Sequence, residues 1–135
     1  MPPSYRWRGA FANTEVNALH AEAFATRLFT NDEWNWEDLL PRHSLGWVVA
    51  RDGTRLVGFV NVVWDGMTHA WVQDTMVARD QHGRGIGTEM MHLVRIECQR
   101  AGCEWLHVDF DEGLEEFYFR SCGFSRTPAG LMRLA

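Results

Sequence analysis

The segment that most constrains this chain is a glycine-rich stretch at residues 77–88, which reads VARDQHGRGIGT. The residues before it are typical of a strand, and the apolar residues after it recur with helical spacing. Glycines at 83, 85 and 87 let the backbone bend and approach a ligand with no Cβ in the way. A helix that begins here offers free N–H groups and the positive end of its dipole, which suits a pyrophosphate. The stretch predicts a strand, a phosphate-binding loop and a helix, although glycines alone also fit a plain strand-to-helix turn.

Two common kinds of phosphate-binding site are excluded, one by the residues at 88 and 90 and the other by the absence of lysine. A dinucleotide fingerprint GxGxxG needs glycine at 88 or 90, where Thr88 and Met90 stand. All thirteen basic residues are arginine, so the lysine that a P-loop or a Schiff-base enzyme requires is missing. The loop therefore belongs to another kind of site.

The pattern around the loop predicts a mixed α/β protein. Helices are expected over 13–28 and over 32–40, the second ending at Pro41. Strands over 47–50, 56–64 and 70–77 form an antiparallel meander. A helix over 86–101, a strand over 105–110, a short helix over 114–123 and a last strand over 131–134 follow. Because the helix over 86–101 must cross over, the strands on either side of it are expected to be parallel.

Composition narrows the classes of partner and compartment. With 135 residues, of which 46% are hydrophobic, we expect one domain over 1–135 with one core. The net charge of −5 argues against a nucleic acid or an anionic membrane as partner. Three cysteines without paired spacing, and no apolar leader, favour the cytoplasm. Cys98 and Cys103 with His92 or His107 lack the CxxC spacing of a zinc site, so no metal is expected.

Two motifs resemble those of one family, the GNAT superfamily of N-acetyltransferases. Residues 73–91 are similar to its acyl-CoA-binding motif, (Gln/Arg)-x-x-Gly-x-(Gly/Ala), with His82, Gly85 and Gly87 in the three defined positions. FYFRSCGF at 117–124 resembles its Phe-Tyr-x-x-x-Gly-Phe signature. The resemblance implies a central mixed, largely antiparallel sheet that splays between its fourth and fifth strands, flanked by about four helices. The chain departs from the pattern at His82, at Arg79, where proline is common, and at Asp111, where asparagine is frequent.

The resemblance also implies acetyl-CoA as the cosubstrate and a position for it. In the family the pantetheine arm lies in the gap between the fourth and fifth strands, here 70–77 and 105–110, and the pyrophosphate lies on the glycine loop. The residues that this places at acetyl-CoA are Met76, Val77, Ala78, His82, Gly83, Arg84, Gly85, Ile86, Gly87, Thr88 and Asp111. The backbone N–H near Met76 is the candidate oxyanion donor.

Acetyl transfer to an amine needs a base for the amine and an acid for the leaving thiolate. Tyr118 matches the family's general acid, and the alternative is that its hydroxyl only positions the thioester sulfur. Some relatives carry a glutamate base where this chain has Gln73, so Asp74 is the nearest carboxylate. Strand alternation points Asp74 away from the side of Gln73, but a bulge would reverse that. Bulk water, Glu33 and His107 stay open as alternatives.

Aromatic and acidic residues before the loop suggest an acceptor pocket. The candidates are Glu33, Trp34, Trp36, Trp64 and Trp71. Aromatic rings with carboxylates suit a cationic amine, although tryptophans that pack the core give the same pattern. The short chain favours a small-molecule amine over a protein or peptide amine. A non-catalytic acyl-CoA-binding sensor is the alternative function, and dimers are frequent in the family, so a homodimer is an expected assembly.

Overall fold

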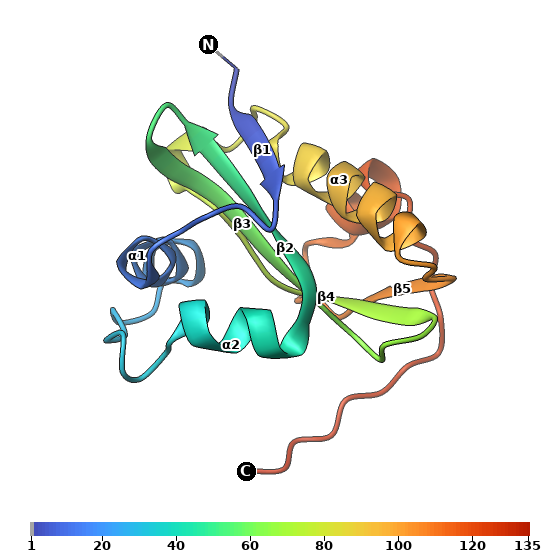
Figure 1. Ribbon diagram of the computed structural model, residues 1–135. Helices are drawn as coiled ribbons and strands as arrows, with labels where there is room; N and C mark the ends of the chain where they lie inside the picture. The colour runs from blue at the N-terminus through green and yellow to red at the C-terminus, as the bar shows by residue number, and fades with distance from the viewer. Residues whose placement is uncertain (1) are drawn as a thin grey trace.

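In the computed structural model, which describes residues 2–135, the strands form one twisted sheet in the order β1-β2-β3-β4-β5 (Figure 1). The strands are β1 (Ser4–Trp7), β2 (Ser44–Asp52), β3 (Arg55–Trp64), β4 (His69–Val77) and β5 (Trp105–Val108). The first four run antiparallel to their neighbours, and β5 runs parallel to β4. The expected mixed, largely antiparallel sheet is confirmed, as is the parallel crossover through the helix after the glycine loop.

Helices cover both faces of this sheet. Helices α1 (Asn13–Phe24) and α2 (Trp36–His43) lie on one face, and α3 (Ile86–Arg100) lies on the other (Figure 1). The short turns η1 (Arg79–Gln81) and η2 (Glu116–Ser121, π-helical) flank α3 and β5 in the chain. With η2, the helices of the described residues match the expected number of about four.

Alternation along β3 assigns each side chain to one face. Phe59 is fully buried toward α1 and α2, with its ring centroid 6.0 Å from that of Trp36 and 5.3 Å from that of Phe11. Burying such a ring contributes about 1.5–3 kcal/mol. Gly58 faces the other way, since a Cβ there would lie 2.9 Å from Ile86 of α3. A larger residue at position 58 would push α3 away from the sheet.

The predicted second helix differs from the observed one at both ends. α2 begins at Trp36, not at residue 32, because Asn35 caps it: its Oδ1 accepts from the backbone N–H of Asp38 at 3.2 Å. The helix also continues through Pro41 to His43, so the predicted stop at Pro41 is wrong. Pro41 removes only one backbone hydrogen bond from a two-turn helix that runs directly into β2. The first helix begins at Asn13 as expected but ends at Phe24, before residue 28, because its C-cap Ala25 adopts a φ of 52°.

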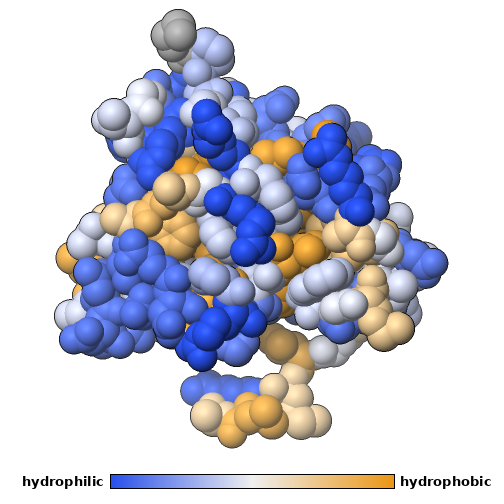
Figure 2. All heavy atoms as spheres, in the orientation of Figure 1, coloured by the Kyte–Doolittle hydropathy of each residue, from blue (hydrophilic) through white to orange (hydrophobic). Residues whose placement is uncertain are grey.

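The two ends of the chain were predicted least well. β1, which pairs with β2, has only four residues, too few for a recognisable alternation, and was missed. β5 ends at Val108 and not at 110. The last strand expected at 131–134 is absent from the described chain. These residues project away from the rest of the protein, and Leu131 and Leu134 are each 89% exposed (Figure 2). The apolar residues there did not form a strand, because no described strand lies alongside to pair with them.

Within residues 2–135, no helix has both the length and the apolar character that crossing a bilayer requires.

Candidate active site

The sheet opens halfway along β4. The pairing of β4 with β5 runs from His69–Trp105 to Val72–Val108, and β5 ends there. β4 continues to Val77 and pairs with β3 alone among the described strands. The backbone edge of residues 73–77 is therefore left to face the gap, at the place where the splay was expected.

A β-bulge lies on this open stretch. Phe59 pairs with Met76, and Asn61 pairs with Gln73, so β4 has one residue more than β3 between these pairs. Asp74, one of the residues in the bulge, has a φ of 56°. This left-handed conformation costs about 1–2 kcal/mol for residues other than glycine. Because of the bulge, Asp74 and Gln73 both point to the α1 and α2 face. Strict alternation would have separated them, and the bulge that the sequence left open is present.

The carboxyl of Asp74 is partly buried on that face. Burial raises its pKa, opposed by the nearby charge of His20 and by a hydrogen bond from Asn61. The Asn61 amide is oriented by Ser44, whose hydroxyl donates to Oδ1 at 2.5 Å. Asn61 is only 6% exposed. A carboxyl with a raised pKa binds a proton more readily than an ordinary aspartate, as a general base requires.

The side chain of Tyr118, which comes from η2, lies on the opposite face of the sheet from Asp74. Its side chain is 5% exposed and hydrogen-bonds Thr75, the residue after Asp74. The ring stacks on Phe110 with centroids 4.6 Å apart. Burial raises the pKa of Tyr118, and the Thr75 hydrogen bond only partly opposes this. The phenol is therefore protonated at neutral pH and can donate.

The glycine loop has the backbone geometry that the sequence predicted. Gly83 and Gly85 adopt φ values of 86° and 76°, and Gly85 is the N-cap of α3. The first N–H groups of α3 have no partner within the helix, as at any helix start. A Cβ at Gly87 would come within 3.0 Å of the Phe117 ring, so glycine lets η2 pack against α3. The loop thus fits a phosphate group through its backbone.

The predicted side-chain contributors of the loop are engaged by the protein itself. His82 Nε2 lies 3.3 Å from the carbonyl oxygen of Val77. Arg84 contacts the Asp52 carboxylate at 3.1 Å and donates to Gln81 at 2.5 Å. Asp111 is exposed in the turn before η2, where its carbonyl accepts from the Leu114 N–H at 3.3 Å. A phosphate group at this loop would therefore meet backbone N–H groups before any free side chain.

The predicted acceptor residues do not form one pocket. Trp36 is 2% exposed and donates from Nε1 to Asn17 at 2.8 Å, so it belongs to the core. The Trp34 ring lies near it, tilted by 49° with centroids 5.6 Å apart, and Trp34 is 44% exposed. Trp64 pairs with Ala70, which places it on the α3 face, whereas Trp71 lies on the α1 and α2 face.

Two candidates for the base are placed unfavourably. Glu33 lies on the surface in a two-pronged ion pair with Arg27, which lowers its pKa to about 2. A carboxylate so readily ionised is a poor proton acceptor. His107 is already committed: its Nε2 lies 2.7 Å from Nδ1 of His69, and its ring stacks on Trp71 with centroids 4.8 Å apart.

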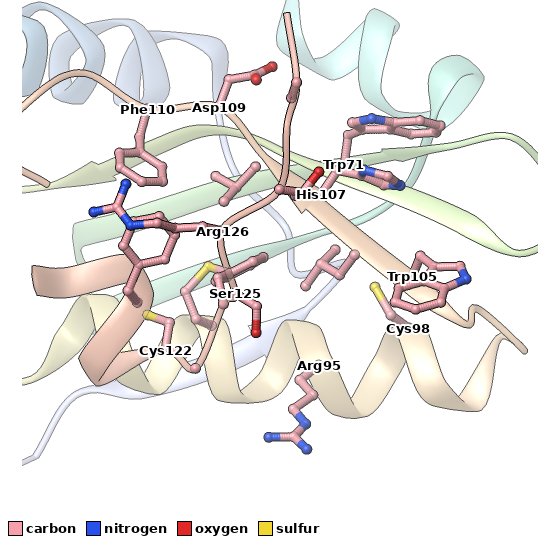
Figure 3. A pocket seen from close by; sticks show the side chains of 18 of the residues that line it. Trp71, Arg95, Cys98, Trp105, His107, Asp109, Phe110, Cys122, Ser125 and Arg126 are labelled. Atoms are coloured by element: carbon pink, nitrogen blue, oxygen red, sulfur yellow. The ribbon is translucent and has the colours of Figure 1, made fainter. Parts of the chain in front are cut away.

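A groove lies along β5 and not at the glycine loop. It encloses about 1240 Å³ between β5, α3 and residues 122–130, and none of residues 82–88 lines it. Figure 3 shows Cys98 pointing into this groove from α3 and Arg95 pointing away. Burial raises the pKa of Cys98 to about 12 and that of Cys122 to about 11. Both remain thiols at neutral pH, so neither is a ready nucleophile. In the described residues no cluster of side chains could hold a metal ion.

Four side chains around the site were not found from the sequence: His20, Asn61, Thr75 and Phe110. Asn61 carried a signal, as the one polar residue within the apolar run 56–64. His20 lies on the apolar face of α1, a position that predicts a core residue. Thr75 and Phe110 give no sequence signal, because their roles arise from contact with Tyr118.

The model of the acetyltransferase (GNAT) family matches residues 12–124. The chain belongs to this family. No curated protein matches it by sequence. Among solved structures, a probable acetyltransferase of unknown function from methicillin-resistant Staphylococcus aureus is similar, at TM-score 0.82 and 22% identity over 98% of each chain.

Two further similar structures have named acceptors. AAC(6')-Iy, in complex with the bisubstrate analogue CoA-S-monomethyl-acetylneamine, aligns at TM-score 0.78 and 13% identity over 100% of this chain and 99% of that one. A ribosomal-protein-alanine N-acetyltransferase from Brucella melitensis aligns at TM-score 0.75 and 19% identity over 99% and 100%. At these identities the likeness shows a shared fold.

Proposed function

We propose that this protein, a single domain, transfers the acetyl group of acetyl-CoA to a primary amine, by direct attack while both substrates are bound. The observation that carries the proposal is the bulge in β4. It presents Asp74 to one face of the open sheet and Thr75, with Tyr118, to the other. A base and an acid thus flank the gap from opposite sides.

The chain offers a fitting cradle for acetyl-CoA. The unpaired edge of 73–77 suits an extended arm, and the positive-φ glycines at the start of α3 suit the pyrophosphate. Met76, Val77 and Ala78 hold the arm in this proposal, and residues 82–88 hold the pyrophosphate. When bound, acetyl-CoA supplies a thioester carbonyl that is open to attack.

The side chains around the gap divide the proton transfers. Asp74 takes one proton from the arriving ammonium, so that the neutral amine nitrogen can bond to the acetyl carbon, and solvent takes the second proton from the nitrogen as the amide forms. Tyr118 donates its phenolic proton to the sulfur as the carbon–sulfur bond breaks. The thiols of Cys98 and Cys122 stay protonated, which favours direct transfer over an acyl-enzyme.

The acceptor side favours a small amine with an apolar portion. Asp74, Met76 and Phe59 face α1 and α2, and the exposed part of Trp34 lies near Phe29, with centroids 6.2 Å apart. The Asp74 carboxyl on this face and the exposed face of the Trp34 ring both suit an amine that arrives as a cation. AAC(6')-Iy in complex with its bisubstrate analogue is consistent with this class.

The first test is thermal unfolding with and without acetyl-CoA, in the parent, in Gly87→Glu and in Gly130→Glu. At 100 times its dissociation constant, the ligand stabilises by about 2.7 kcal/mol, a shift of roughly 6–15 °C. Gly87→Glu places a carboxylate at the loop and a Cβ against Phe117, so the shift should vanish. Gly130 has open space around it and serves as the control.

Turnover is then assayed by thiol release with 2-phenylethylamine, spermidine, an aminoglycoside and a peptide with a free N-terminal alanine. Turnover of a small amine supports the proposal, and turnover of the peptide alone would overturn the small-molecule acceptor. Binding of acetyl-CoA with no turnover of any amine would favour a sensor. The absence of a thermal shift at millimolar acetyl-CoA would overturn the proposal that this protein is an acetyl-CoA-dependent enzyme.

A further inference from the structure

The last five residues of the chain, 131–135, form an arm that does not pack on the rest of the molecule. Leu131, Met132 and Leu134 of this arm are 89%, 80% and 89% exposed. Within the described chain, no backbone hydrogen bond joins the arm to another segment, and the arm projects away from the sheet (Figure 1). A contiguous group of apolar side chains held in water is typical of a surface that binds another protein.

The strand β5 presents a free edge to solvent. It is the last strand of the sheet, and within the described residues it pairs with β4 alone. The groove of about 1240 Å³ runs along this strand. An unpaired edge strand is a ready template for a further strand. The chain therefore has both a strand edge without a neighbour and an apolar arm without a partner.

The apolar side chains of the arm match those of β5. In an extended segment, Met132 and Leu134 point to the same face. Leu106 and Val108 of β5 also share one face, since they pair with buried residues of β4, and both line the groove. An arm that lies beside β5 in extended conformation can place both of its apolar side chains along the groove and remove them from water.

Charge favours the same pairing. The arm carries Arg133 and no carboxylate side chain, whereas residues 104–116 carry six carboxylates and neither lysine nor arginine. Two of these carboxylates, Glu104 and Asp109, line the groove at the two ends of β5. In an extended arm Arg133 points away from the two apolar side chains, toward the face of β5 on which alternation places Asp109.

A second copy of this chain is the occupant that these observations favour. Residues 124–130 form one wall of the groove, and the chain then leaves the body instead of turning back into it (Figure 1). Pro128 fixes its own φ and favours extended backbone at Thr127, so the segment leads outward. Each copy thus has one arm and one groove, and a twofold axis between two copies satisfies both pairs at once.

We propose that residues 131–135 of each copy bind along β5 of the other as an added strand, so that two copies form a dimer by exchanging their arms. This proposal does not depend on the acetyl transfer proposed above. The interface borders the candidate active site, because Phe110 lines the groove and stacks on Tyr118.

The test is the mass of the full-length protein in solution, followed by sedimentation velocity over a range of protein concentrations. Leu134→Asp places a carboxylate on the arm where the groove is apolar. Leu28→Asp makes the same change at another exposed leucine, 63% exposed in the segment after α1, and is the matched control. Both leucines lie outside the core, so circular dichroism of each variant should match that of the parent.

The parent and Leu28→Asp should both sediment as dimers. Leu134→Asp should raise the dissociation constant of the dimer by about tenfold or more, because the new carboxylate loses water in an apolar groove. Arg133→Glu should weaken the dimer in the same direction, and adding Asp109→Arg to that variant should restore it.

Two results would contradict the proposal. A parent that stays monomeric at every concentration would show that the arm does not bind a second copy. A dimer that neither Leu134→Asp nor Arg133→Glu weakens would place the interface on another surface. Because the measurement needs neither acetyl-CoA nor an amine, its outcome is separate from that of the activity assays.

Discussion

The two faces of the open sheet contrast in how they carry function. On the α3 face, the glycine loop and the segment that carries Tyr118 are each one continuous stretch of sequence. The backbone conformation of each stretch is set by its own residues. On the α1 and α2 face, Asp74, Asn61, Ser44 and His20 come from four separate elements. The first kind of site is built from local backbone conformation, and the second from packing. Changes on the packed face should therefore reveal couplings that no motif indicates.

The largest catalytic loss is expected for Asp74→Asn, which keeps the shape of the side chain but removes its basicity. A general base contributes roughly 10²–10⁴-fold, and kcat should fall by that factor with acetyl-CoA binding unchanged. Asp32→Asn, the same change at an exposed site, is the control. A rate equal to that of the parent would move the base to water.

The same variant should be more stable than the parent at neutral pH. Folding raises the pKa of Asp74, so its contribution to stability is present below the ordinary value of 3.8 and is lost as pH rises through the folded pKa. Asparagine does not ionise. The stability difference, measured by urea unfolding between pH 4 and 7.5, should grow with pH in favour of Asp74→Asn.

A smaller loss, toward the lower end of the same range, about 10²-fold in kcat, is expected for Tyr118→Phe on the opposite face. The ring can still stack on Phe110, and only the hydroxyl and its contact with Thr75 are lost. Tyr5→Phe changes the other tyrosine of the chain and is the control. If kcat is unchanged in steady-state assays, the thiolate takes its proton from solvent.

The smallest effect is expected for Glu33→Gln. Glu33 is on the surface, paired with Arg27 and held ionised with a pKa of about 2. Surface changes of this kind stay within about twofold in kcat/KM. A loss comparable to that of Asp74→Asn would return Glu33 to the candidates for the base and undo the contrast between the two faces.

Tyr118 was singled out by the family resemblance, whereas residue patterns along the chain were enough to predict the glycine loop, the meander and the crossover helix. Each depends on local conformational preference: glycine for positive φ, alternation for a half-buried strand, helical spacing for α3. The family resemblance then placed the splay, and the end of β5 at Val108 confirms it. The short β1 depends on a partner strand far along the chain and was missed, and the start of α2 was misplaced although its cap, Asn35, is local.

Tertiary structure alone decided which face Asp74 serves. One extra residue in β4 reversed its direction, and a bulge is set by the register of two strands, which no single segment encodes. It also decided that Trp36 belongs to the core and that Trp64 lies on the α3 face of the sheet. Local sequence determines which conformations a segment prefers, whereas the surroundings of a side chain depend on how distant segments pack.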